Sequence, residues 1–172
     1  MTYFGLEEVN FEVVHWPVHF FVIDNTDYLV GGDATQSGYT AQWLQARLAA
    51  STLPWKVVIL HYGPWVSGLG HIMYTTRRWP YREWGADLLM SGHTHVYERF
   101  ALPDGLVAIT CGTCNPMYWS QPNPANIWNP APTTGSVFGY GLAPQRAGTC
   151  RCRATARRLL IEYITTAETL VD

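Results

Sequence analysis

Histidine is concentrated in one part of this 172-residue chain, since four of its six histidines lie between positions 61 and 95. His93 and His95 form an H-x-H pair, and residues i and i+2 of an extended backbone point to the same side, so both imidazoles can bind one cation. Neutral imidazole is a ligand for Zn, Fe, Mn or Cu. His61 strengthens this metal-site hypothesis, and the alternative is that all three are ordinary polar residues at strand ends.

Short apolar runs predict the elements that would carry these histidines. Residues 55–60 and 87–90 are typical of buried strands, and the first run ends at His61 while the second is followed by His93. Apolar spacing over residues 38–51 predicts a helix, with Ser37 or Thr40 as its N-cap. Strands that alternate with helices indicate an α/β fold, whose ligands bind beyond the carboxyl ends of the strands.

The remaining elements are predicted from the same patterns. Residues 11–23 form a strand that is broken near Pro17, and residues 29–32 close this opening β region. Residues 72–85 are helical in part, and 96–102 pairs with 106–111 in a hairpin that turns at Asp104-Gly105. Further predictions are loops over 62–71 and 112–136 and strands over 137–141 and 157–164.

A longer pattern of residues surrounds the histidines. Residues 61–68 have the sequence HYGPWVSG, His71 follows, and residues 85–99 have the sequence GADLLMSGHTHVYER. Their order and spacing resemble the calcineurin-like metallophosphoesterases, and most closely the purple acid phosphatase branch. Gln42-Trp43-Leu44 upstream, and residues 138–141 and 159–163 downstream, resemble the same family. Gly63 departs from it, because many members have proline there.

The resemblance implies a fold, a reaction and a set of site residues. The fold is an α/β sandwich of mixed sheets flanked by helices, and residues 1–172 would be the C-terminal portion of one catalytic domain. The reaction is hydrolysis of a phosphate ester by a metal-bound hydroxide, at a site that holds two metal ions drawn from Fe, Zn and Mn. His61, His93 and His95 match metal ligands of the family, and His71 matches the histidine that contacts the phosphate and protonates the leaving group.

The family takes its other ligands from D-x-H, G-D-x-x-Y and G-N-H motifs that precede these histidines. The chain contains no D-x-H and no G-N-H, and Gly32-Asp33 lacks the tyrosine of the G-D-x-x-Y motif, so Asp33 is interpreted as an ordinary loop residue. We therefore expect a fragment, a truncated gene product or one part of a split enzyme, with weak or no activity as an isolated chain. The alternatives are a non-catalytic module that keeps the histidine cluster, or a subunit completed in trans by the missing N-terminal half.

Composition excludes several classes of function. The formal charge is −2, from 11 basic and 13 acidic residues, which argues against electrostatic binding of nucleic acid. No apolar run is long enough to span a membrane. No secretory signal is visible, although the resemblance favours a secreted or extracytoplasmic protein. Because only 14% of residues are charged, against a typical share of about 25%, and because half a domain would leave a sheet face uncovered, we expect poor solubility.

The remaining polar and aromatic residues leave alternatives open. Cys111, Cys114, Cys150 and Cys152 could form a structural zinc site, form one or two disulfides, or remain free thiols. His15 and His19 are interpreted as ordinary polar residues of a strand. Trp119 and Trp128 are placed at a core edge rather than in a substrate cleft.

Overall fold

The computed structural model describes residues 9–25, 35–66, 75–112, 137–138 and 147–166. These residues form nine strands, one α-helix and one 3-10 turn. Their bounds are β1 (Phe11–His15), β2 (Val18–Val22), α1 (Tyr39–Ala50), β3 (Trp55–Leu60), η1 (Thr75–Arg77), β4 (Leu88–Ser91), β5 (Val96–Ala101), β6 (Val107–Cys111), β7 (Val137–Phe138), β8 (Gly148–Thr155) and β9 (Arg158–Thr165).

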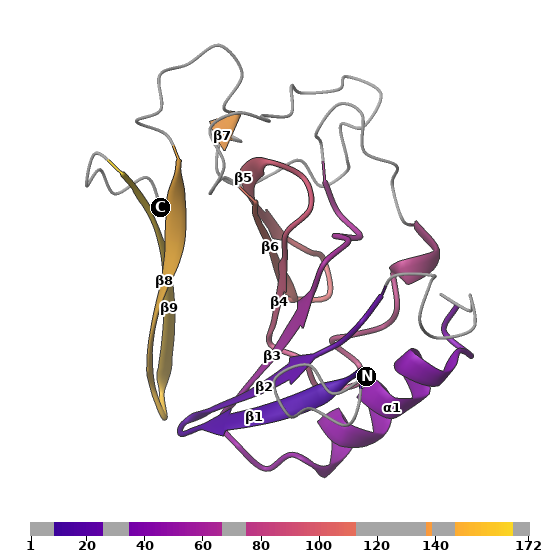
Figure 1. Ribbon diagram of the computed structural model, residues 1–172. Coiled ribbons are helices and arrows are strands. Elements are labelled where there is room, and N and C mark those ends of the chain that lie inside the picture. The colour runs from indigo at the N-terminus through magenta and orange to yellow at the C-terminus, as the bar shows by residue number, and fades with distance from the viewer. Residues whose placement is uncertain (1–8, 26–34, 67–74, 113–136, 139–146, 167–172) are drawn as a thin grey trace.

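Seven of these strands form one mixed sheet in the order β1-β2-β3-β4-β6-β5-β7 (Figure 1). The neighbouring strands β2, β3, β4 and β6 are parallel, while β1, β5 and β7 are antiparallel to their partners. The parallel centre gives the sheet a common carboxyl edge, where the ends of β3 and β4 lie side by side. This edge is where an α/β fold binds its ligands.

The strand predicted over residues 11–23 is a pair of antiparallel strands, β1 and β2. The break predicted near Pro17 is a reversal of the chain at Trp16-Pro17, whose peptide bond is cis. The hairpin of β5 and β6 is confirmed, with Gly105 in the left-handed conformation at its turn.

Helix α1 covers one face of the seven-stranded sheet (Figure 1). Ala41, Leu44 and Leu48 of the helix are fully buried against strand residues such as Phe21 and Val58. The predicted helix is confirmed, but its predicted caps are wrong. Gly38, in an extended conformation, is the N-cap without any side-chain hydrogen bond, whereas Ser37 precedes it and Thr40 lies inside the helix.

The helix predicted in part over residues 72–85 is reduced, within the described residues, to η1 and a turn at 81–85. Trp79, Tyr81 and Trp84 all bury their rings in the core cluster under α1. Their spacing of two and three residues does not match one face of an α-helix, and Pro80 lies between the first two. An irregular backbone lets all three rings reach the core, which a regular α-helix over these residues would not.

Strands β8 and β9 form a second, two-stranded antiparallel sheet that covers the other face (Figure 1). The prediction over 157–164 corresponds to β9, whereas β8 had no counterpart among the predicted elements. Buried side chains from both sheets join in one cluster, in which the rings of Tyr97 and Tyr163 stack with centroids 4.2 Å apart. Two hydrogen bonds tie the layers together, from Trp55 Nε1 to the Thr155 carbonyl (2.7 Å) and from Arg99 Nη2 to the Ile161 carbonyl (2.8 Å).

The structure therefore confirms the predicted fold class, an α/β sandwich built on a mixed sheet, although helices are few among the described residues: α1 covers one face and the β8–β9 hairpin covers the other. Both faces of the large sheet carry buried clusters. Among the described residues, no helix is long and apolar enough to span a membrane. Three predicted elements lie wholly or mostly outside the described residues: the strand end at 29–32, the loop over 112–136 and the strand over 137–141.

Candidate metal centre

His61 and His93 meet at the carboxyl edge of the sheet. Strands β3 and β4 are parallel neighbours in which Leu60 pairs with Ser91, so the residues that follow them leave the sheet side by side. The Gly92 N–H donates to the His61 carbonyl at 3.2 Å. Nδ1 of His93 then lies 3.1 Å from Nε2 of His61, with ring centroids 4.9 Å apart.

Asn25 holds the backbone that carries His61. It follows β2, the next parallel strand, and is buried, with 5% of its surface exposed. Its Oδ1 accepts hydrogen bonds from the N–H groups of His61 (3.2 Å) and Tyr62 (3.1 Å), and its Nδ2 donates to the Tyr62 carbonyl (2.7 Å). One amide side chain thus satisfies three backbone groups where β3 ends.

The chain turns sharply at His93 to present its ring. His93 has φ +57°, a left-handed conformation that is uncommon outside glycine. Thr94, which is fully buried, donates its N–H to the Gly92 carbonyl at 2.7 Å, and the Gly112 N–H donates to the Val96 carbonyl at 3.0 Å. A side chain at position 112 would collide with the Thr94 carbonyl, so glycine at the end of β6 allows this turn to pack closely.

An aromatic ring and a buried cation lie beside the histidine pair. The ring of Tyr62 is 4.9 Å from that of His61 and 4.4 Å from that of His93, in edge-on contact with both. The guanidinium carbon of Arg77, a residue only 1% exposed, lies 5.4 Å from the centre of the Tyr62 ring. Two imidazoles, a tyrosine ring and a buried guanidinium thus lie together at this edge of the sheet.

The two imidazoles are hydrogen-bonded to each other, and the separation of their nitrogens is also compatible with two ligands of one metal ion. Two nitrogens that are each about 2.0–2.1 Å from an ion lie about 2.9 Å apart at a right angle and about 3.4 Å apart at a tetrahedral angle. The observed separation of 3.1 Å falls between these values. Among the described residues, however, no three His, Cys, Asp or Glu side chains are grouped to hold a metal ion. The predicted grouping of His61, His93 and His95 is therefore seen only for the first two among the described residues.

The roles predicted for His61, His93 and His95 as metal ligands stay predictions, although the first two are now seen to be neighbours. His71, the predicted general acid, lies outside the described residues, as do Asp33, Cys114, Trp119 and Trp128. His15 is exposed at the end of β1, and His19 lies 2.9 Å from the Ser51 hydroxyl and 3.5 Å from a Glu12 carboxylate oxygen, as befits polar residues of a strand.

The sequence did not predict roles at this site for Asn25, Tyr62 and Arg77. The place of Asn25 near the carboxyl edge could have been predicted, because it lies shortly after β2 as His61 lies after β3, although its bonds to the backbone could not. Nothing in the pattern around Arg77 distinguishes it from an exposed arginine, so its burial depends on the tertiary structure.

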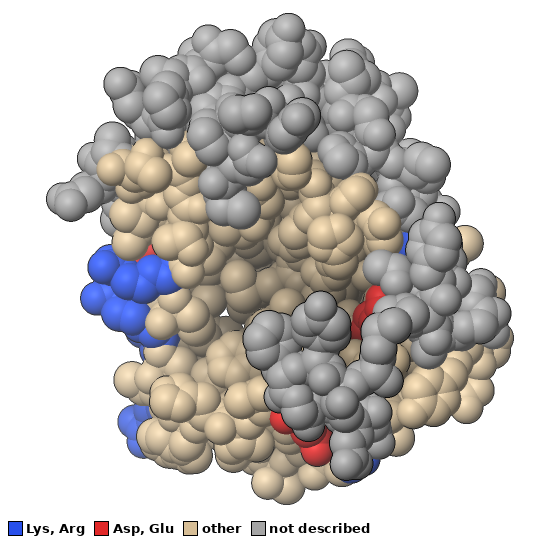
Figure 2. All heavy atoms as spheres, in the orientation of Figure 1, with Lys and Arg blue, Asp and Glu red and all other residues tan. Residues whose placement is uncertain are grey.

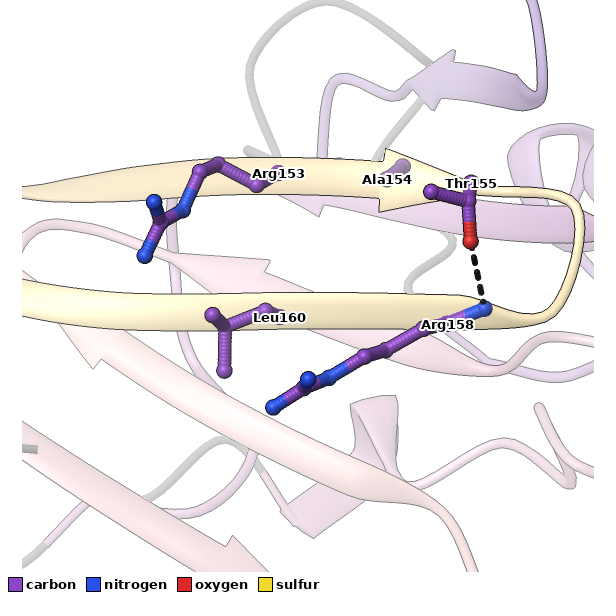
Figure 3. A pocket seen from close by; sticks show the side chains of 5 residues that line it. All are labelled: Arg153, Ala154, Thr155, Arg158 and Leu160. Carbon is purple, nitrogen blue, oxygen red and sulfur yellow. Dashed lines mark hydrogen bonds between the residues drawn. The ribbon is translucent and has the colours of Figure 1, made fainter.

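A cavity of about 350 Å³ elsewhere in the structure does not belong to this site (Figure 3). Its lining comes from both strands near the turn of the β8–β9 hairpin, including Arg153, Thr155 and Arg158. The Thr155 carbonyl accepts a hydrogen bond from Trp55, the first residue of β3, whereas His61 follows Leu60, the last residue of that strand. The cavity therefore lies at the opposite edge of the sheet from the histidine pair.

Comparisons with known proteins find related sequences and related folds. The sequence profile of the calcineurin-like phosphoesterases matches residues 4–97. Purple acid phosphatase 22 of Arabidopsis thaliana is 39% identical over 87 aligned residues, which cover 41% of this chain and 20% of that protein. The chain therefore spans about a fifth of the length of this curated relative.

Two solved structures share the fold. A purple acid phosphatase from yellow lupin (Lupinus luteus) seeds, PPD1, superposes with a TM-score of 0.70 at 17% identity, over 95% of this chain and 31% of that one. GAP50, described as the anchor in the inner membrane complex of Plasmodium, superposes with a TM-score of 0.63 at 12% identity, over 95% of this chain and 51% of that one. At such low identities these matches establish the fold alone.

Proposed function

This chain belongs to the calcineurin-like phosphoesterase family, and on that basis we propose that it supplies part of the active site of a purple-acid-phosphatase-like enzyme that hydrolyses phosphate esters. The observation that carries the proposal is the contact between His61 and His93 at the carboxyl edge of the parallel strands. These are two residues of the motifs by which the sequence resembles the family.

His61 and His93 would hold the metal, since neutral imidazole is a good ligand for Fe, Zn and Mn. A metal ion held there would supply the acidification of a water molecule and the neutralisation of negative charge that phosphate-ester hydrolysis needs. Asn25 fixes the His61 backbone, and the packed turn at Gly92-His93-Thr94 fixes the His93 ring, so both donors are positioned before an ion arrives.

We propose that the remaining ligands come from a polypeptide that carries the D-x-H, G-D-x-x-Y and G-N-H motifs. Without them two histidines cannot hold a pair of metal ions, which is why we expect the isolated chain to hydrolyse phosphate esters slowly or not at all. His71 is assigned to protonate the leaving group, as the family resemblance implies. An extracytoplasmic location and a dinuclear site of Fe, Zn or Mn are part of the same proposal.

Metal binding tests the histidine pair without depending on activity. We expect the purified chain to bind Zn²⁺ weakly in competition with a chromogenic chelator, and His93→Ala or His61→Ala to weaken binding by more than about tenfold. His15→Ala is the matched control, because His15 is exposed and distant in sequence from the pair. Binding that survives His93→Ala but is lost in Cys111→Ser would overturn the assignment in favour of a thiolate site.

Reconstitution tests the reaction. Adding a polypeptide with the three missing motifs in trans should produce hydrolysis of p-nitrophenyl phosphate that neither part shows alone. In the reconstituted enzyme, His71→Ala should lower kcat more than it raises KM, because a general acid acts mainly in the transition state. Metal binding with no hydrolysis after reconstitution would favour the non-catalytic binding module instead. Fast hydrolysis by the chain alone, abolished by His61→Ala, would show that no partner is needed.

A further inference from the structure

Two cysteines far apart in the sequence face each other between the two sheets. Cys111 is the last residue of β6 in the large sheet, and Cys150 lies in β8 of the small one. Both are partly buried, and both pack against the cluster of apolar side chains that joins the two layers.

The register of the strands explains why they meet. Cys111 is paired with Tyr97 across β6 and β5, and Cys150 is paired with Tyr163 across β8 and β9. Directly paired residues of antiparallel strands point to the same face of their sheet. The rings of Tyr97 and Tyr163 stack between the sheets, 4.2 Å apart and inclined by 13°, so the cysteine beside each tyrosine must also face the opposite layer.

The two thiols are in direct contact. A hydrogen bond from the Cys150 thiol lowers the pKa of Cys111, against the opposing effect of burial, and so increases the share of reactive thiolate at Cys111. Cys152 lies two residues further along the same face of β8, but it is exposed and does not pack against the cluster that joins the sheets. Cys150 and Cys152 are separated by about 6.6 Å along their strand, near the upper limit for the Cα atoms of a disulfide.

We propose that Cys111 and Cys150 form a disulfide that joins the two sheets when the chain is exposed to a small-molecule disulfide such as oxidised glutathione. The Cys111 thiolate attacks one sulfur of glutathione disulfide, which forms a mixed disulfide and releases one glutathione thiolate. The Cys150 thiol loses its proton, its sulfur attacks Sγ of Cys111, and the second glutathione thiolate leaves. Two cysteine thiols are oxidised, and one glutathione disulfide is reduced to two thiols.

The cross-link would act at a structurally important point. Cys111 precedes Gly112, whose backbone packs against the turn at Thr94 beside His93. A bond from Cys111 to Cys150 would fasten the hairpin of β8 and β9 to the strand that supports this turn. It would close a loop of about 40 residues in the unfolded chain and should raise Tm by roughly 10 °C.

Peptide mapping tests the pairing directly. Trypsin cleaves after Arg99, Arg146, Arg151 and Arg153, so Cys111 and Cys114 fall in peptide 100–146, Cys150 falls in 147–151 and Cys152 falls in 152–153. After treatment with oxidised glutathione and alkylation of the remaining thiols, we expect peptide 100–146 to be linked to 147–151, and a reductant to release them. The link should be absent in Cys111→Ser and in Cys150→Ala.

Control variants separate this pairing from its rivals. Cys114→Ser and Cys152→Ser should keep both the linked peptides and the rise in Tm, because neither residue takes part. A link that survives in Cys111→Ser would assign the bond to Cys114 and overturn the proposal. A dominant link to peptide 152–153, or glutathione adducts without any cross-link, would also overturn it.

Discussion

Asn25 shows how one uncharged side chain can decide where a histidine lies. The polar groups of its amide are bonded to His61 and Tyr62, which immediately follow β3. These backbone groups have left the sheet and would otherwise need water or another partner. The position of the His61 ring relative to His93 therefore depends on a residue whose amide is bonded to the backbone.

Replacement of this amide should destabilise the protein and weaken metal binding together. Asn25→Ala removes three hydrogen bonds and leaves partly buried backbone groups unpaired, so we expect the free energy of unfolding in urea to fall by about 2–3 kcal/mol. Asn25→Asp keeps the acceptor atom and loses the donor to Tyr62, so its loss should be smaller. Zn²⁺ affinity, measured by chelator competition, should fall in the same order.

Ser37→Ala is the control for this prediction. It removes an exposed hydrogen bond to Thr35, and its effect should remain within about 0.5 kcal/mol. Equal stability and Zn²⁺ affinity in Asn25→Ala and Ser37→Ala would contradict the positioning role of Asn25.

The meeting of His61 and His93 could be predicted from the sequence, because parallel strands that lie side by side bring their carboxyl ends together. The part played by Asn25 could not be predicted as easily. Its partners are backbone groups, which every residue has, so no pattern of side chains identifies them. The left-handed backbone of His93 is set by packing against Thr94 and Gly112 and likewise leaves no mark in the local sequence.

Strands with a dense apolar face were predicted most accurately. Residues 55–60 correspond to β3, because this strand is buried on both faces and is apolar at nearly every position. Strand β8 was missed because its sequence, GTCRCRAT, has only small side chains on its buried face and arginines on the other. Its pairing with β9 supplies the stability that its own composition does not indicate.

Two arginines of β8 contribute to the stability of the hairpin by pairing with Glu162 on β9. Its side chain is only 9% exposed and accepts hydrogen bonds from Arg151 at 3.1 and 3.2 Å, and it lies 2.8 Å from Arg153. Hydrogen bonds and charge from these two guanidinium groups lower the pKa of the Glu162 carboxyl, against the opposing effect of burial. In the unfolded chain the Glu162 side chain has no partner and keeps its ordinary pKa. Because its pKa is lower in the folded protein, the ionised carboxylate stabilises the folded hairpin.

The contribution of Glu162 should therefore depend on pH. Because the folded-state pKa is lowered, the stabilisation is complete above the unfolded pKa of about 4.3 and is lost as pH falls through the folded value. Glu162→Gln should lower the urea midpoint of unfolding at pH 7. The gap, which is the difference in urea midpoint between the parent protein and the variant, should narrow steadily below about pH 4. Glu83→Gln, at an exposed position of a turn, should show no such gap. A gap that is constant with pH would contradict the role of the carboxylate.

The surface of the protein is short of charge, and its charged groups are unevenly distributed. Figure 2 shows a face that is mostly uncharged, with basic side chains gathered at the left over the hairpin of β8 and β9. That hairpin carries Arg151, Arg153, Arg157 and Arg158. The large exposed apolar residues gather elsewhere, chiefly on β1 and the turn after it. The prediction of an uncovered sheet face is wrong for the described residues, because both faces of the large sheet carry buried clusters, and the exposed apolar side chains lie at an edge instead.

Edge strand β1 should make the chain self-associate. Val13, Val14 and Trp16 are 47%, 60% and 67% exposed, and β1 pairs only with β2 among the described residues. An apolar strand at a sheet edge presents both unpaired backbone groups and a surface that gains by leaving water, whereas lysine at an edge opposes pairing. In sedimentation-velocity runs we expect oligomers that grow with concentration in the micromolar range.

The double variant Val14→Lys/Trp16→Lys should shift the chain to monomer, with the Kd for self-association raised by more than about tenfold. Tyr39→Lys, which adds a lysine at an equally exposed position of α1, should leave association unchanged and so separates an effect of the edge from one of net charge. A parent chain that remains monomeric at every concentration would contradict the prediction, because the exposed edge would then be too weak to pair.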